Sequence, residues 1–141
     1  MGDKVFLDTN VLVYLFDRDA PTKQEKAREI VETEGRGRNI VISTQVLKEF
    51  YVSVTRKLGK PLSEQEAEGA VRDLSALDVV EIDVQMVLRA IAGARGQQIS
   101  LWDALIVEAA QARACRCLLT EDLQHGREFG ALRLENPFRS G

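Results

Sequence analysis

Short apolar runs alternate with longer segments of helical periodicity along almost the whole chain. The short runs predict buried strands at residues 4–8, 39–43, 79–82, 116–120 and 131–136. The longer segments predict helices at residues 11–16, 21–35, 44–59, 63–77, 84–95 and 101–114. Strands that alternate with helices favour an α/β fold in which a mostly parallel sheet is covered on both faces.

The length and composition fit one soluble globular domain over residues 1–141. No apolar run is long enough to cross a membrane, and the N-terminus does not resemble a signal peptide. We therefore expect a cytoplasmic protein with no membrane partner, whose Cys115 and Cys117 are small buried thiols rather than a disulfide or a zinc site. The net charge of −3 gives no global basic signature for nucleic acid, although a basic rim can surround an acidic centre.

Four carboxylates come from separate segments but are expected at the same edge of the sheet. Asp8 closes the first strand, and Asp122 follows a late one. Asp103 lies in the first turn of the helix that leads into that late strand, and Glu49 near the start of the helix after the second strand. Because right-handed crossovers place the carboxyl ends of parallel strands at one edge, where sites form, these side chains are predicted to meet.

Each of these acids also has a purely structural interpretation. Ser100 and Asp103 fit a capping box, in which each side chain accepts a bond from a backbone N–H at the helix start. Asp8 fits a cap or an Asx turn with Asn10, and Asn10 is itself expected to cap the helix at 11–16. Turn or surface roles are open for Glu49, Glu121 and Asp122.

Taken together, the four acids favour a metal site. Converging carboxylates repel one another and raise each other's pKa unless a cation is present. An all-oxygen cluster suits Mg²⁺ or Mn²⁺ rather than zinc, and the single histidine, His125, rules out a site with several histidines. Such a metal typically acts on a phosphate group. The sequence has no glycine-rich phosphate loop of the Walker A or GxGxxG type, which argues against nucleotide binding by that route.

Four stretches that carry these acids resemble the PIN-domain nucleases in order and in spacing. They read FLDTNVLVYLF, STQVLKEF, SLWDALIVEAA and LLTEDLQHG, and together they extend over nearly the whole chain. The length and the late NPF at 136–138 resemble the VapC-like toxin branch. The resemblance implies a three-layer α/β/α sandwich, Mg²⁺- or Mn²⁺-dependent endoribonuclease activity on RNA, a homodimer, and a cognate antitoxin.

By the same resemblance, the catalytic and metal-binding residues are Asp8, Glu49, Asp103 and Asp122. Thr9 and Thr120 match hydroxyl residues that accompany the first and last acids. One departure concerns the segment at 123–126, LQHG, where many toxin-type members have a further Asp followed by Phe. Glu121 is therefore open as a residue that shares the role of Asp122.

Candidates for other surfaces and other functions complete the prediction. Possible phosphate contacts of RNA are Arg18, Lys23, Arg56, Lys57 and Lys60. Possible dimer-interface residues are Phe50, Tyr51 and Val54.

A phosphatase of the haloacid dehalogenase type is disfavoured, because it needs a second aspartate where this chain has Asn10. A receiver-type domain is disfavoured because only Asp83 follows the third strand, without a downstream lysine; a non-catalytic binding module of the same fold stays open.

Overall fold

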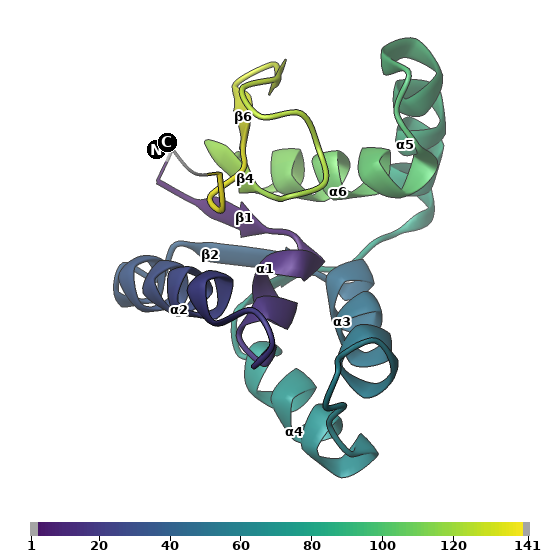
Figure 1. Cartoon of the computed structure of the whole chain (residues 1–141). Helices are drawn as coiled ribbons and strands as arrows, with labels where there is room; N and C mark the ends of the chain where they lie inside the picture. Colours follow the sequence, from purple (N-terminus) through teal and green to yellow (C-terminus); the bar gives the residue numbers. More distant parts are fainter. Residues whose placement is uncertain (1–2, 140–141) are drawn as a thin grey trace.

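The computed structural model describes residues 3–139 and places their strands in one mixed sheet (Figure 1). The order across the sheet is β3-β2-β1-β4-β6-β5. All neighbouring pairs are parallel except β5 and β6, which are antiparallel. The strands are β1 (Val5–Leu7), β2 (Ile40–Ser43), β3 (Asp78–Val80), β4 (Cys117–Leu119), β5 (Glu128–Phe129) and β6 (Leu132–Glu135).

The helices cover the two faces of the sheet in two groups. They are α1 (Thr9–Tyr14), α2 (Pro21–Arg36), α3 (Thr44–Arg56), α4 (Glu64–Leu74), α5 (Val84–Gln97) and α6 (Leu101–Ala112). The chain first steps outward from β1 to β2 and β3, then returns to the other side of β1 for β4. Right-handed crossovers therefore place α1 to α4 on one face and α5 and α6 on the other, as their mutual contacts and Figure 1 show. The predicted α/β/α sandwich with a mostly parallel sheet is confirmed.

The reversal of direction beside β1 creates a switch point between β1 and β4. In sheets of this kind the crevice outside the carboxyl ends of two such strands is where ligands bind. The backbone N–H of Asp8, just after β1, donates to the carbonyl of Leu119 at the end of β4, at 3.0 Å. The two strand ends that carry predicted acids are therefore joined directly.

The core is made of the central strands and the inward faces of the helices. Phe6, Leu7 and Leu118 are completely buried, as the apolar runs of the sequence predict. Phe50 and Val54 are also completely buried within this core, so their prediction as dimer-interface residues is wrong. Phe50 and Val54 share one face of α3 because they are four residues apart, and that face packs into the core of the same chain.

Most predicted elements are confirmed, and their ends shift by a few residues. Two differences are larger. The expected cap at Asn10 is wrong, because Asp8 is the N-cap of α1 and its carboxylate accepts a bond from the N–H of Thr9. The two-residue strand β5 was not predicted; it pairs with β6 across a turn in which Gly130 has a φ of +60°.

Two further expectations concern the thiols and membranes. Cys115 and Cys117 are both buried and free, as predicted. Burial raises the pKa of Cys115 to about 11 and that of Cys117 to about 12, so both stay protonated thiols near neutral pH. Within residues 3–139, no helix has the length and apolar character needed to cross a membrane.

Candidate active site

Asp8 lies at the centre of the crevice between β1 and β4 and is 6% exposed. Its Oδ1 accepts from the N–H of Thr9 at 2.7 Å, and its Oδ2 accepts from the hydroxyl of Thr120 at 2.7 Å. Burial raises the pKa of Asp8 from 3.8 to about 6; the charges of Asp122 and Glu49 add to this, and the two hydrogen bonds oppose it. The fold thus holds the Asp8 side chain in place by hydrogen bonds, while burial makes its ionised form less favourable than it would be in water.

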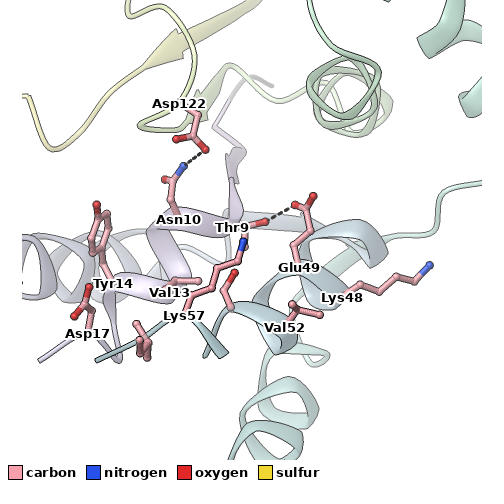
Figure 2. A pocket seen from close by; sticks show the side chains of 12 residues that line it. Thr9, Asn10, Val13, Tyr14, Asp17, Lys48, Glu49, Val52, Lys57 and Asp122 are labelled. Carbon is pink, nitrogen blue, oxygen red and sulfur yellow. Dashed lines mark hydrogen bonds between the residues drawn. The ribbon is translucent and has the colours of Figure 1, made fainter. Parts of the chain in front are cut away.

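Glu49 lies on α3, two turns after the end of β2, and its carboxylate is held by neutral donors. The hydroxyl of Thr9 donates to Oε1 at 2.8 Å, as Figure 2 shows, and the amide of Gln45 donates to Oε2 at 3.3 Å. These bonds fix Glu49 next to the segment that carries Asp8. Glu49 is therefore not a freely solvated surface residue, because two side chains hold its carboxylate.

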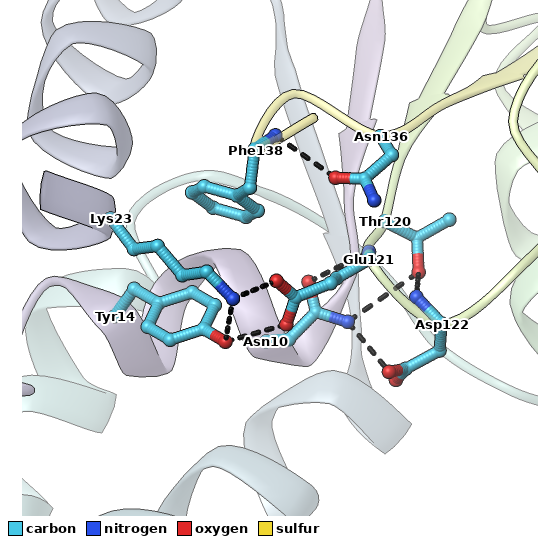
Figure 3. Close-up of polar contacts among 8 residues, drawn as sticks. All are labelled: Asn10, Tyr14, Lys23, Thr120, Glu121, Asp122, Asn136 and Phe138. Atoms are coloured by element: carbon cyan, nitrogen blue, oxygen red, sulfur yellow. Dashed lines mark hydrogen bonds and ion pairs between the residues drawn. The ribbon is translucent and has the colours of Figure 1, made fainter. Parts of the chain in front are cut away.

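Asp122 follows β4 and is tied to the start of α1 through Asn10 (Figure 3). The amide of Asn10 donates to Asp122 Oδ2 at 3.0 Å and to Thr120 Oγ1 at 3.4 Å. The carbonyl oxygen of the same side chain accepts from the N–H of Glu121 at 3.2 Å. The N–H of Asp122 donates to Thr120 Oγ1 at 3.1 Å, so Asn10 holds the carboxylate of Asp122 and Thr120 holds its backbone.

Glu121 belongs to a separate network on the far side of Asn10. Its carboxylate forms an ion pair with Lys23 and accepts from the hydroxyl of Tyr14 at 2.5 Å. Burial opposes ionisation, but the bonds from Lys23 and Tyr14 lower the pKa of Glu121 below its ordinary value. Figure 3 shows this side chain directed toward Tyr14 and Lys23, away from Asp122. In this arrangement Glu121 does not stand in for Asp122.

Asp103 lies in the first turn of α6, and its cap is only half of the predicted box. The hydroxyl of Ser100 accepts from the N–H of Asp103 at 3.0 Å. The N–H of Ser100 does not donate to the Asp103 carboxylate in return, whereas Ser63 and Glu66 make both bonds at the start of α4. Within residues 3–139 no group donates to the Asp103 carboxylate. Capping therefore explains Ser100 but leaves that carboxylate free.

The structure brings three of the four predicted acids together and leaves the fourth on a neighbouring helix. The charges of Asp122 and Glu49 both contribute to the raised pKa of Asp8. Asp103 is joined to them indirectly, because Gln45 bonds both Glu49 and the carbonyl of Trp102. Among residues 3–139, no three carboxylate, thiol or imidazole side chains are placed so that they could hold one metal ion. A single shell of four acids stays a prediction.

The chemistry of these donors nevertheless fits a hard divalent cation. Each oxygen of Asp8 accepts one hydrogen bond, which leaves a second lone pair on each for a ligand. The side chains that hold the acids are hydroxyls and amides, and among residues 3–139 no lysine or arginine forms an ion pair with Asp8, Glu49 or Asp122. Carboxylate and hydroxyl oxygens are the groups that Mg²⁺ and Mn²⁺ prefer.

A cleft of about 610 Å³ opens beside Glu49 and Asp122 (Figure 2). It runs between α1 and α3, and apolar side chains such as Val13 and Val52 form part of its wall. Of the five basic residues predicted to contact RNA, Lys57 lines the cleft, and Lys48 joins it although it was not predicted. The other lining residues are Thr9, Asn10, Tyr14, Asp17, Ser53 and Leu58.

Two polar residues of the site escaped the sequence reasoning. The sequence pattern predicts a cap at Asn10, because it precedes an apolar helical run, and it gives no separate signal for Gln45 inside its helix. Both follow a strand end within a few residues, at the edge where sites form. That position is the signal that could have identified them.

Solved structures with a similar fold include a toxin–antitoxin complex, a VapBC complex and a toxin. A toxin–antitoxin complex from Klebsiella pneumoniae gives a TM-score of 0.68 at 20% identity, over 95% of this chain and 98% of that one. DNA-bound VapBC from Salmonella typhimurium gives 0.67 at 21% identity, over 97% and 99%. VapC20 of Mycobacterium tuberculosis, a toxin that cleaves the sarcin–ricin loop, gives 0.65 at 15% identity, over 82% and 87%. At these identities the likeness concerns the fold.

Sequence comparison adds the family. No curated protein sequence matches the chain. The family model of the PIN domain matches residues 5–127, a range that contains all four predicted acids. With this match over most of its length, and with the fold and the acidic crevice described above, the chain belongs to the PIN domain family.

Proposed function

We propose that this chain is a Mg²⁺- or Mn²⁺-dependent endoribonuclease and the toxin of a toxin–antitoxin pair. The observation that carries the proposal is Asp8, a buried carboxylate at the switch point of the sheet with Glu49 and Asp122 as charged neighbours. The charges of Asp122 and Glu49 oppose ionisation of Asp8, and no lysine or arginine within residues 3–139 pairs with these acids; a divalent cation would relieve that repulsion. The PIN family membership and the VapC-like fold support a nuclease over a phosphatase.

The residues of the chain would divide the work as follows. Asp8, Glu49, Asp103 and Asp122 would hold the cation, directly or through water. When bound, the cation supplies a positive charge at the scissile phosphate and lowers the pKa of water. Thr9, Thr120 and Asn10 orient the acids, so that little reorganisation is needed when substrate arrives.

The cleft would give the RNA a path past Glu49 and Asp122. Lys48 and Lys57 lie on its wall and would contact phosphates, which positions a strand without reading its sequence. Lys23 is occupied by its ion pair with Glu121, and Arg18, Arg56 and Lys60 lie outside the cleft lining. By resemblance to the family, the expected products carry a 5′-phosphate and a 3′-hydroxyl.

The proposal includes two protein partners. The structural neighbours from Klebsiella pneumoniae and Salmonella typhimurium are toxin–antitoxin complexes, which supports a cognate antitoxin for this chain. A second copy of the chain is the other partner, although Phe50 and Val54 are too buried to mediate the contact. Light scattering at micromolar concentration tests the dimer, and a monomer mass would contradict it.

The experiment is incubation of the purified chain with total RNA, with Mg²⁺ or with EDTA, followed by mapping of the cut ends. Asp8→Asn is the test variant. Asp73→Asn is the matched control, because Asp73 is an exposed acid on α4 away from the site. We expect cleavage in Mg²⁺ by the wild type and the control only. Undiminished cleavage in EDTA contradicts the metal dependence, and RNA binding without cleavage indicates a non-catalytic binding module.

A further inference from the structure

Gln45 is a buried amide with an unusual set of partners. It is the second residue of α3, just after β2, and is 8% exposed. Its Nε2 donates to Glu49 Oε2 at 3.3 Å and to the carbonyl oxygen of Trp102 at 3.3 Å. Its Oε1 is buried, and no group among residues 3–139 donates a hydrogen bond to it.

The orientation of this amide follows from its neighbours. If the amide were turned over, Oε1 would face the carboxylate of Glu49 and the carbonyl of Trp102, which are both acceptors. The NH₂ group must therefore face them, and Oε1 is left without a donor as a result. A buried acceptor without a donor costs free energy, whereas an apolar side chain of the same size avoids that cost. An apolar side chain, however, could not make the two hydrogen bonds that the NH₂ group donates.

Those contacts connect the segments that carry three of the acids. Glu49 is held from one side by Thr9, the neighbour of Asp8 in the sequence, and from the other side by Gln45. Through Trp102, Gln45 also reaches the residue immediately before Asp103. The side chain thus fixes the carboxylate of Glu49 and ties α3 to the first turn of α6.

We infer that Gln45 is a positioning residue for the divalent-cation site. Its amide sets the placement of the Glu49 carboxylate relative to Asp103. The inference rests on the proposed function. Partners that orient metal ligands through hydrogen bonds typically change metal affinity by roughly 10–100-fold when they are removed. Loss of the Gln45 amide should therefore weaken Mg²⁺ binding much more than it affects the metal-free fold.

The test compares thermal melting of the full chain at rising MgCl₂ concentrations, without RNA. The variant is Gln45→Met, which keeps the size and removes both the NH₂ group and the orphaned oxygen. We expect a metal-free Tm close to that of the wild type. The Mg²⁺ concentration needed for a given rise in Tm should increase about 10-fold. Gln111→Met is the matched control, because Gln111 also joins two elements, by donating to the carbonyl of Phe129 at 3.2 Å, and contacts none of the acids. Its response to Mg²⁺ should equal that of the wild type.

A double-mutant cycle separates positioning from a general structural role. If Gln45 acts through Glu49, Gln45→Met should change the Mg²⁺ response no further in a Glu49→Gln background. Additive effects in that background overturn the inference, as does a lower metal-free Tm with an unchanged Mg²⁺ response. Gln45→Asn serves if Gln45→Met does not fold, because the shorter amide cannot reach both partners and should weaken the Mg²⁺ response in the same way.

The two levels of the proposal fail in different ways. If the wild type itself shows neither a Mg²⁺-dependent Tm nor cleavage, the proposed function is wrong. If the wild type shows both and Gln45→Met keeps the wild-type Mg²⁺ response, only the role of Gln45 is wrong.

Discussion

The two halves of the acidic crevice are built in opposite ways. At the switch point between β1 and β4, every oxygen of Asp8 has a donor, and Asp122 is held by Asn10. At the start of α6, only the backbone N–H of Asp103 is engaged, by Ser100, and its carboxylate has no donor among residues 3–139. In one half, hydrogen bonds from other residues fix the carboxylates. In the other half, the Asp103 carboxylate receives no hydrogen bond from residues 3–139.

Burial explains the difference. Asp8 is almost completely buried, so the chain must supply the hydrogen bonds that water would otherwise give. Asp103 is partly exposed, so water can solvate its carboxylate. In this site, the acid that is more buried is therefore also the one whose carboxylate is held by more hydrogen bonds. This difference predicts that substitutions in the two halves differ in their effects on stability even where they abolish the same activity.

The largest effect is expected for Asp8→Asn. Cleavage should fall by more than about 100-fold, because loss of a direct ligand should exceed the effect of losing a residue that only orients one. Without metal, the variant should be more stable than the wild type at pH 7.5, by up to about 3 kcal/mol, since the pKa of Asp8 is raised from 3.8 to about 6.

The sign of the pH dependence follows from the raised pKa. The folded chain binds the proton on Asp8 more tightly than the unfolded chain does, so the ionised carboxylate destabilises the fold above about pH 6. The advantage of Asp8→Asn should therefore shrink as the pH falls through 6 toward 4. Denaturant unfolding of both proteins in EDTA across this range is the measurement, and a constant difference would refute the explanation.

Asp103→Asn is the matching test in the other half. Cleavage should again fall by orders of magnitude, and the stabilisation by Mg²⁺ should shrink, whereas the metal-free Tm should equal or slightly exceed that of the wild type. Ser100→Ala is the control for the cap. It should cost about 1 kcal/mol of stability and keep the cleavage rate of the folded protein. Equal Mg²⁺-induced shifts in Asp103→Asn and wild type would return Asp103 to a structural role.

Asn10→Ala should have an intermediate effect. The substitution removes the bonds to Asp122, Thr120 and the N–H of Glu121 in one step. Because Asp122 is exposed and its carboxylate loses the hydrogen bond from Asn10, we expect about 10–100-fold slower cleavage. Kinetics at saturating RNA measure it, with Asn39→Ala as a control outside the site. A rate equal to that of the wild type would show that Asp122 needs no support.

Lys23→Met should have the smallest effect. It breaks the partly exposed ion pair with Glu121 and removes a cation 5.0 Å from the ring of Tyr14. We expect a loss of roughly 1 kcal/mol or less, smaller at high salt, with an unchanged cleavage rate. A salt-dependent rise in KM for RNA would instead assign Lys23 to the substrate path.

Sequence patterning predicted the layers of the fold because apolar periodicity is a local property. Runs such as KVFLD and NIVIS identify buried strands, and the order of strands and helices then fixes the edge where the acids lie. The sequence could not show whether Asp8 or Asn10 caps α1, or whether Ser100 and Asp103 form one or both bonds of a capping box. Both questions depend on which backbone N–H each side chain reaches in the folded chain.

Long-range partners were beyond the reach of local patterns. The bond from Asn10 to Asp122 spans 112 positions, and that from Gln45 to Trp102 spans 57. Amide side chains have no periodicity that reveals such contacts. Phe50 and Val54 were misplaced for a related reason, since an apolar stripe looks the same whether it packs on its own sheet or on a second subunit.

The central claim is that a divalent cation joins the organised half of the crevice to Asp103. Crystals grown with Mn²⁺ and measured for anomalous scattering test it most directly. We expect a Mn²⁺ peak at about 2.0–2.2 Å from an oxygen of Asp8, with Asp103 bound to the ion directly or through one water. A crevice without Mn²⁺ at millimolar metal, or an ion bound with Asp103 turned toward bulk solvent, would contradict it.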